Sequence, residues 1–304
     1  MAVTEVTTPA PVAGAPPAPR AGRRVGVGSY VALLPFFGFL LVFLIVPTVT
    51  VVVGAFGDGE GGFTLGNVRA LTSEAAVNAL WKSVLLSGST AVIGAVLGAL
   101  LSYLIVSLGP RSLIRRTTLS VCGVLAQFGG VTLAFAFISL LGFSGVLTEA
   151  LKTWPGVDIF GSGWLFGLPG LIVVYCYFQI PLMVIVFTPA LEGLRPQWRE
   201  AATSLGATTG QFWRMVGFPL LSPAFLGSML LLFANAFAAY ATAAVLVSQG
   251  NPITPLFIRS ALTSEILLGQ RNLGFALALQ MIVVVAIVMG LYALLLRRTA
   301  RWMR

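Results

Sequence analysis

The chain contains no histidine, only two cysteines and few charged residues, which make up 9% of its 304 positions. Without histidine, the common zinc and haem ligand sets and histidine-based catalytic triads are excluded. The cysteines, Cys122 and Cys176, each lie inside an apolar run, which favours two small buried side chains over a disulfide or a metal site. Covalent catalysis by this chain is therefore not expected.

The chain is rich in hydrophobic residues. Hydrophobic residues make up 58% of the chain and the mean hydropathy is +0.97, whereas about a quarter of a typical soluble protein is charged. These values indicate an integral membrane protein. The 18 basic residues outnumber the 9 acidic ones and the isoelectric point is about 10.4, but basic residues in membrane proteins commonly record orientation. Because no nucleic-acid-binding motif accompanies them, a nucleic-acid partner is not expected.

The first 28 residues are rich in Pro, Ala and Gly and have few large apolar side chains. Such a segment cannot bury enough surface to order itself, so we expect a disordered tail. A signal peptide is the alternative, because Arg23 and Arg24 precede an apolar run. That run is too long for a signal sequence and lacks a clear small-residue cleavage site, so the first span should be retained.

Six apolar stretches follow, each long enough for a helix that crosses a bilayer, which needs about 20 residues. They are continuous rather than alternating, which excludes a β-barrel, and lipid-exposed backbone must form its own hydrogen bonds. The sequence therefore predicts an all-α integral membrane domain over residues 29–304, with six transmembrane helices at about 29–55, 80–107, 116–141, 164–190, 221–247 and 272–297.

The basic residues predict the orientation of these spans. Thirteen of the 18 precede span one, join spans two and three, join spans four and five, or end the chain. Basic residues accumulate on the cytoplasmic side, so both termini are expected inside. The five on the other side are Arg69, Lys82, Lys152, Arg259 and Arg271.

The loop over residues 195–219 is mildly polar, although it lies between two long apolar runs. Gly193 can end span four and Pro196 suits the first turn of a new helix, which Gly206 can terminate. Thr208 or Thr209 can cap a second helix, which Pro219 is expected to end. A helix, a turn and another helix are therefore predicted on the cytoplasmic side.

Small side chains make this loop suitable for docking against another protein. Ala201, Ala202, Gly206 and Ala207 would allow a partner's backbone to approach closely, and three larger residues would supply apolar anchors: Phe212, Trp213 and Met215. The alternative is an ordinary amphipathic connector lying on the membrane surface, with Trp213 at the interface.

The spacing within the loop resembles a known pattern. Glu200-Ala201-Ala202, three residues, Gly206, nine residues and Val216-Gly217-Phe218-Pro219 resemble the EAA loop of the membrane-spanning subunits of type I ATP-binding-cassette importers. Val216 and Phe218 depart conservatively from the isoleucine and leucine of that pattern. The loop also lies two spans before the end of a six-span chain, as in that family, and the resemblance extends over about residues 80–295.

The resemblance implies a permease fold whose EAA loop forms a coupling helix seated in a groove of a separate ATPase. It carries the coupling role to Glu200, Ala201, Ala202, Gly206, Ala207, Phe212 and Pro219. The chain has no GxxxxGK[ST] motif, so ATP and magnesium would be bound by the partner ATPase and no cofactor by this chain. The implied partners are two ATPase subunits, a second permease of the same or a sister kind, and an extracytoplasmic solute-binding protein. The implied location is a bacterial inner membrane.

Polar residues inside the predicted spans are candidates for the solute pathway, because they are costly in lipid. They are Gln127, Tyr175, Gln179, Ser228, Asn235, Tyr240, Thr242 and Gln280. Ser228, Asn235 and Thr242 recur every seven residues, which predicts one stripe along a single helix. The alternative role is helix packing, as expected for the GxxxG formed by Gly94 and Gly98 in span two.

The solute itself is predicted only by class. The pathway residues would suit a small polar, hydroxylated or cationic solute such as a polyamine, and the last two spans resemble the permeases for polyamines, iron, thiamine and phosphonates. A sugar permease of the same superfamily is the alternative. An ion-coupled secondary transporter would need charged or broken spans, and a structural membrane protein would have no reason to keep the EAA spacing.

Overall fold

The computed structural model describes residues 27–58, 62–154, 156–161, 163–247, 253–263 and 271–301. The predicted disordered tail, residues 1–28, lies outside the described residues except for its last two, which begin the first helix. The helices and helical turns follow in this order: α1 (Val27–Leu40), η1 (Leu41–Ile45), α2 (Val46–Ala55), α3 (Gly66–Ala70), α4 (Glu74–Ser107), α5 (Leu113–Gln127), α6 (Gly130–Leu141), α7 (Val146–Thr153), η2 (Trp164–Phe166), α8 (Leu168–Glu192), α9 (Pro196–Ser204), α10 (Thr209–Phe212), η3 (Trp213–Gly217), α11 (Phe218–Ala238), α12 (Ala241–Leu246), α13 (Thr254–Thr263) and α14 (Arg271–Arg301).

Six helical segments in the described part of the chain are long and apolar enough to cross a membrane. The all-α, six-helix membrane architecture predicted from the sequence is therefore confirmed. The segments are Leu34–Ala55, Glu74–Ser107, Gly130–Thr153, Leu168–Glu192, Thr209–Ala238 and Asn272–Leu294.

The chain divides into two compact units, residues 1–49 and 50–304. The described part of the first unit is α1, η1 and the start of α2, and from Leu34 to Val49 its apolar side chains are exposed except for the half-buried Leu40, as with Phe43 at 67%. Exposed apolar side chains are expected where a helix faces lipid or another membrane helix.

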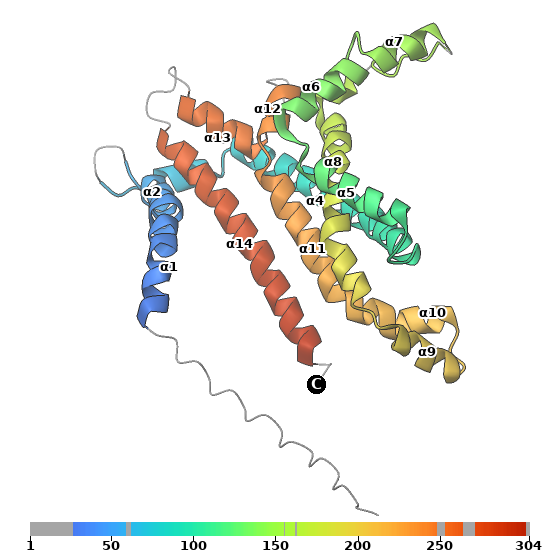
Figure 1. The fold of residues 1–304 in the computed structure, drawn as a ribbon. Helices are drawn as coiled ribbons and strands as arrows, with labels where there is room; N and C mark the ends of the chain where they lie inside the picture. Colours follow the sequence, from blue (N-terminus) through green and yellow to red (C-terminus); the bar gives the residue numbers. More distant parts are fainter. Residues whose placement is uncertain are drawn as a thin grey trace, which may run out of the picture. The chain divides into compact units, whose positions relative to one another are not determined.

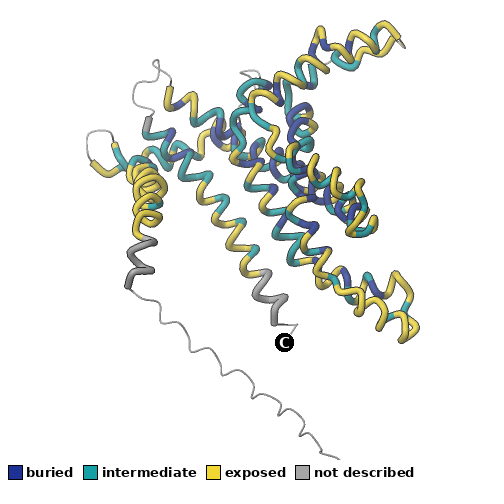
Figure 2. Tube along the Cα trace, viewed as in Figure 1, coloured by how far each residue is buried: buried dark blue, intermediate teal, exposed yellow. Residues whose placement is uncertain are grey.

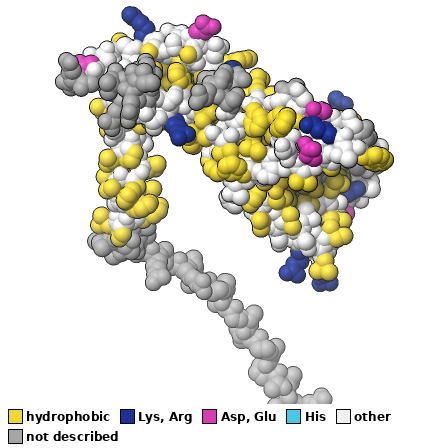
Figure 3. Space-filling model, turned by 90° about the horizontal axis from the view of Figure 1, so that it is seen from above, with side chains coloured by type: hydrophobic (Ala, Val, Ile, Leu, Met, Phe, Trp, Pro, Cys, Tyr) yellow, Lys and Arg dark blue, Asp and Glu magenta, His cyan; other side chains and the backbone are white. Residues whose placement is uncertain are grey.

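Three helices form the core of the second unit, because α4, α8 and α11 pack against one another (Figure 1). Buried positions concentrate on these helices, whereas α14 is buried or half-buried over residues 272–281 and alternates between exposed and half-buried residues over 282–294 (Figure 2). Close approach of α4 and α8 depends on Gly98: a Cβ there would lie 2.5 Å from Cβ of Met183. On the face seen in Figure 3, patches of hydrophobic side chains are spread over the surface and charged side chains lie at few points, as expected from the small charged fraction.

The third predicted span, residues 116–141, is divided in two. Helix α5 ends at Gln127 and α6 begins at Gly130. Gly129 is extended and Gly130 has a φ of +72°, a conformation that glycine adopts readily and that breaks a helix. The third membrane-crossing segment accordingly begins at Gly130.

The fifth predicted span, residues 221–247, is also interrupted, so the expected stripe of Ser228, Asn235 and Thr242 is wrong. Helix α11 ends at Ala238 and Ala239 is extended, with a ψ of 115°, before α12 begins at Ala241. Ser228 and Asn235 lie on α11 but Thr242 lies on α12. A seven-residue repeat keeps one face only along an unbroken helix.

Pro219 does not end the second helix of the loop, contrary to the prediction. The helix continues from Thr209 through to Ala238. A widened π turn, η3, lies just before the proline, where the amide of Phe218 donates to the carbonyl of Trp213, five residues back. A wider turn gives room for the proline ring, which would otherwise clash with the preceding turn. The loop therefore joins rigidly to span five.

Candidate functional site

The first candidate site is the projecting pair of helices α9 and α10 (Figure 1). Helix α9 begins with Pro196 and ends in a Schellman motif. Its two hydrogen bonds run from the amide of Gly206 to Thr203 O at 2.9 Å and from the amide of Ala207 to Ala202 O at 3.0 Å. Gly206 has a φ of +79°, which an L side chain rarely adopts. This glycine therefore fixes the angle at which the chain leaves α9.

A capping box starts α10 immediately after that turn. The amide of Gln211 donates to Thr208 Oγ1 at 3.3 Å, and the amide of Thr208 donates to Gln211 Oε1 at 2.8 Å. Of the two threonines predicted as caps, Thr208 is the one that serves. Both ends of the turn are thus satisfied by local hydrogen bonds, which makes the pair of helices a defined shape rather than a loose loop.

The predicted coupling residues are divided between surface and interior. Glu200, Ala201 and Gly206 are exposed, and Ala202 and Ala207 are half-buried. Phe212 is only 7% exposed and packs beside Trp213, so the expectation that it offers a surface anchor is wrong. Phe212 therefore supports α10 from inside, beside Trp213. Pro219, the last of the set, is exposed at the start of α11.

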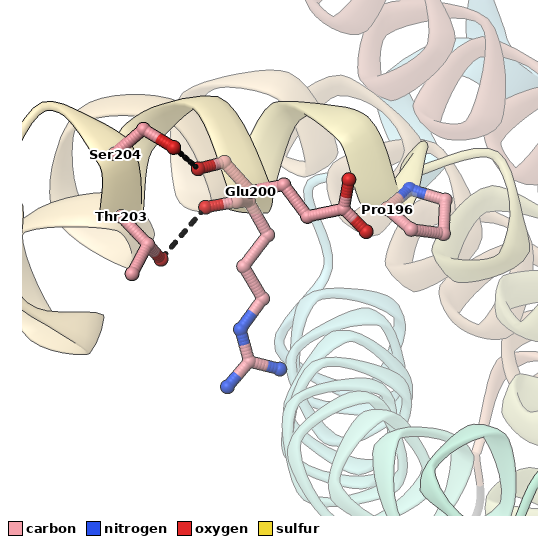
Figure 4. A pocket seen from close by; sticks show the side chains of 5 residues that line it. Pro196, Glu200, Thr203 and Ser204 are labelled. Atoms are coloured by element: carbon pink, nitrogen blue, oxygen red, sulfur yellow. Dashed lines mark hydrogen bonds between the residues drawn. The ribbon is translucent and has the colours of Figure 1, made fainter.

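A shallow pocket of about 460 Å³ lies along α9 (Figure 4). It is lined by Pro196, Arg199, Glu200, Thr203 and Ser204. The hydroxyls of Thr203 and Ser204 donate to the backbone carbonyls of Arg199 and Glu200 at 2.9 and 3.0 Å. These bonds occupy backbone oxygens and leave the carboxylate of Glu200, which extends toward Pro196, at the surface (Figure 4). The surface along α9 therefore presents the charged residues Arg199 and Glu200 beside Pro196.

Three exposed apolar residues on this surface add to the predicted set. Leu205 is 88% exposed at the tip, next to Gly206; Trp198 is 39% exposed on α9; and Met215 is 75% exposed on η3. Met215 was expected as an anchor, whereas Leu205 and Trp198 were missed. Leu205 could have been found from the sequence, because it is the one large apolar residue between Glu200 and Thr209.

The second candidate site is a pocket of about 290 Å³ between the two helix interruptions. It is lined by the ends of α5 and α11, the starts of α6 and α12, and one ring of α8: Ala126, Gln127, Gly129, Gly130, Phe178, Asn235, Ala238, Ala239, Tyr240, Ala241 and Thr242. Irregular backbone within a membrane domain is tolerated where protein buries it or where it lines a cavity. In transporters such interruptions often mark the binding site.

Side chains from neighbouring helices donate hydrogen bonds to the backbone at both interruptions. Thr242 Oγ1 donates to Gly130 O at 3.1 Å, which ties α12 to the start of α6. Tyr175 OH donates to Ala239 O at 2.9 Å, which ties α8 to the end of α11. At the rim, the guanidinium of Arg259 lies 5.9 Å from the ring centre of Tyr240. The pocket is thus a built feature and not a fraying of helix ends.

Four of the eight predicted pathway residues line this pocket: Gln127, Asn235, Tyr240 and Thr242. Tyr175 is fully buried behind it and holds the wall. The other three, Ser228, Gln280 and Gln179, do not line it. Ser228 is buried and donates to Ala224 O of its own helix at 2.9 Å, Gln280 lies on α14, and Gln179 lies on α8.

Gln179 has the geometry of a packing residue. It is fully buried on α8, and its Nε2 donates to Thr90 Oγ1 at 3.4 Å and to Leu232 O at 3.0 Å. One side chain therefore crosslinks α8 to both α4 and α11. This arrangement agrees with the packing alternative, in which amides join membrane helices.

The pocket lining is polar but uncharged. It offers the amides of Gln127 and Asn235, the hydroxyls of Tyr240 and Thr242, and the backbone of the two interruptions. These groups both donate and accept hydrogen bonds. Such a site can orient a small polar molecule.

Comparison with known proteins shows what the chain is similar to. Residues 131–301 match the family model described as "Binding-protein-dependent transport system inner membrane component". The ferric transport system permease protein FbpB of Actinobacillus pleuropneumoniae is 27% identical over 215 residues, which are 71% of this chain and 31% of that protein. The sulfate transport system permease protein CysT of Salmonella typhimurium is 33% identical over 127 residues, 40% of each chain. The chain thus spans about a third of the length of the ferric permease.

Among solved structures, the fold is similar to a chain of a bacterial ABC transporter involved in the import of the acidic polysaccharide alginate. The TM-score is 0.72 with 19% sequence identity, and the match covers 88% of this chain and 94% of that chain. At this identity the likeness concerns the fold alone.

Proposed function

Because this chain belongs to the family of binding-protein-dependent transport system inner membrane components, we propose that it is the permease subunit of an ATP-binding-cassette importer. It forms the solute path and couples that path to a separate ATPase. The observation that carries the proposal is the exposed α9–α10 pair, whose EAA-like sequence adopts a helix, a fixed turn and a second helix continuous with a membrane span.

The continuity of α10 with α11 gives the coupling a physical route. A partner that displaces α9 and α10 also displaces α11, because no break separates Thr209 from Ala238. The far end of α11 lines the pocket at Asn235 and Ala238. Rigid-body movement of helices is an established means of switching a site between two states.

The partners of the proposed importer follow from its mechanism. Two ATPase subunits would bind ATP and magnesium, a second permease would complete the path, and an extracytoplasmic protein would deliver the solute. The chain would lie in a bacterial inner membrane with α9, α10 and both termini on the cytoplasmic side. The distribution of the basic residues supports this orientation.

The pocket between the interruptions supports a small polar solute. Its described lining has amides and hydroxyls but no Asp or Glu, so it gives no particular support to a cation such as a polyamine. The ferric relative falls within the iron, thiamine, polyamine and phosphonate group, whereas the sulfate relative falls outside it and the structurally similar chain belongs to an alginate importer. We therefore keep the proposal at a small polar solute.

An ion-coupled secondary transporter is the competing proposal, and broken spans are a feature that it requires. Two spans of this chain are broken. The pocket at the breaks nevertheless presents no carboxylate among its described residues to bind a coupling ion. Family membership also favours a binding-protein-dependent importer.

Glu200→Lys tests the docking role of α9. Reversal of this exposed charge should reduce co-purification of the ATPase subunit about tenfold, which corresponds to about 1.4 kcal/mol of binding free energy. The measurement is the molar ratio of ATPase to permease after affinity purification of a tagged permease in detergent. An unchanged ratio would remove Glu200 from the interface.

Glu149→Lys is the matched control, because it makes the same charge reversal on an exposed residue of α7, outside the α9–α10 surface. It should leave the ratio as in the unsubstituted chain. Equal loss in both variants would indicate a general effect of charge and not a docking site.

Asn235→Leu tests the pocket. The substitution removes an amide from the lining, so stimulation of ATP hydrolysis by the solute-loaded binding protein should fall several-fold while unstimulated hydrolysis continues. Ser228→Ala is the control, since that hydroxyl is buried on the same helix and bonds only its own backbone. A normal solute response in Asn235→Leu would show that Asn235 serves helix packing and does not contact the solute.

A further inference from the structure

An ion pair joins the end of α8 to the start of α5. Nη2 of Arg115 donates to Oε1 of Glu192, 77 positions later in the chain. The side chain of Arg115 is 14% exposed and that of Glu192 43% exposed. Because the pair is partly shielded from water, its attraction exceeds that of a fully solvated surface pair.

Glu192 lies between a weak point of α8 and the coupling surface. Pro189 is inside α8 and cannot donate a backbone hydrogen bond, which weakens the helix just before its last turn. Beyond Glu192 the chain passes through Gly193 to α9, which begins at Pro196. A displacement of α9 can therefore be absorbed by bending at Pro189 unless another contact carries it.

Arg115 lies at the opposite end of α5 from the pocket. Ala126 and Gln127, at the far end of that helix, line the pocket between the interruptions. The twelve residues from Arg115 to Gln127 span about 18 Å of helix. Helix α5 also packs against α4 and α8 through a buried cluster of Ile105, Cys122 and Val184. Because Leu113–Gln127 form one continuous helix, displacement of its first turn is passed to its last.

We propose that the Arg115–Glu192 ion pair is a mechanical link that carries displacement of α9 into α5 and so into the wall of the pocket. This inference rests on the proposed function, because an ATPase must move α9. The link bypasses Pro189: Glu192 moves with α9, Arg115 follows Glu192, and Gln127 follows as the other end of the same helix. Without the pair, movement of α9 reaches the pocket through α10 and α11 but not through α5.

The test measures the pocket directly and needs no identified solute. Cysteines for spin labels replace Ala126 near the end of α5 and Ala238 at the end of α11, which both line the pocket, after Cys122 and Cys176 are changed to serine. The permease is assembled with its ATPase in lipid nanodiscs. Dipolar broadening of the continuous-wave EPR spectrum is then compared without nucleotide and with ATP plus vanadate.

The spin-labelled chain with Arg115 and Glu192 intact should give a nucleotide-dependent change in broadening. Glu192→Gln should reduce that change at least twofold, while the amount of bound ATPase and its basal hydrolysis rate persist. The exchanged pair, Arg115→Glu with Glu192→Arg, should restore the change, because it recreates the attraction with reversed polarity. Asp158→Asn, which breaks the 3.8 Å ion pair with Lys152, is the matched control and should keep the full change.

Each outcome decides a separate question. A full change in Glu192→Gln, or a loss that the exchanged pair does not repair, overturns the link and leaves the pair as a static brace. If Glu192→Gln fails to assemble, Arg115→Gln decides instead: it removes the charge from the other side of the pair and should also reduce the change at least twofold, whereas a full change contradicts the link. An unsubstituted chain that binds no ATPase, or shows no nucleotide response, contradicts the proposed function itself.

Discussion

Replacing Gly206 with valine should reduce ATP-driven uptake about tenfold or more while ATP hydrolysis continues. Gly206 has a φ of +79°, and no atom lies within 4 Å of where its Cβ would be. The site therefore has room for a side chain, and the difficulty is purely conformational. An L residue in this region costs about 1–2 kcal/mol, and a β-branched residue is especially disfavoured. The turn between α9 and α10 should reopen to relieve this strain.

The measurement is solute uptake per ATP hydrolysed in proteoliposomes that contain the complete transporter. Gly206→Asn is the matched control. Asparagine adds a side chain of about the same size as that of valine, yet it tolerates the left-handed conformation. It should retain most of the coupling. Equal loss in both variants would mean that bulk at the docking surface matters and not backbone conformation.

Replacing Gly98 with valine should reduce the yield of folded permease about fivefold or more. A Cβ at this position would lie 2.5 Å from Met183 Cβ and 2.8 Å from the backbone oxygen of Ile180. A backbone atom cannot move aside as a flexible side chain can, so α4 and α8 must separate. Overpacking of this kind costs about 1–3 kcal/mol or more, and the contact lies in the three-helix core on which both candidate sites depend.

Fluorescence-detected size-exclusion chromatography in detergent measures the folded fraction. Gly88→Val is the control on the same helix, because no atom lies within 4 Å of a Cβ at that position. It should fold as well as the unsubstituted chain. A monodisperse Gly98→Val protein with normal yield would show that α4 and α8 tolerate a wider separation.

The sequence predicted the membrane helices well because their signal is strong and local. Long apolar runs, helix-ending glycines and the capping threonine each depend on neighbouring residues alone. The coupling loop was foreseen for the same reason: Pro196, Gly206 and Thr208 act where the sequence suggests. Pro219 was misread because the compensating π turn at Trp213–Gly217 has no evident sequence signal.

The solute pocket could be predicted only in part. Gln127, Asn235, Tyr240 and Thr242 were singled out as costly polar residues, yet the two interruptions that bring them together were missed. Gly129-Gly130 offered a signal for the first break. The second, at Ala239, carries none, because alanine favours helix and its extended conformation depends on tertiary contacts. Burial of Gln179 and Ser228 likewise depends on neighbours that pattern alone does not reveal.

The hydrogen bonds at the two interruptions have an energetic consequence for how the domain deforms. Thr242 and Tyr175 donate hydrogen bonds to the carbonyls of Gly130 and Ala239. Because the helices are already interrupted there, bending at these two places need not break a continuous series of backbone hydrogen bonds. Distortion should therefore occur readily at these two interruptions, as well as at Pro189 in α8. The pocket between the interruptions can then change its volume at little enthalpic cost.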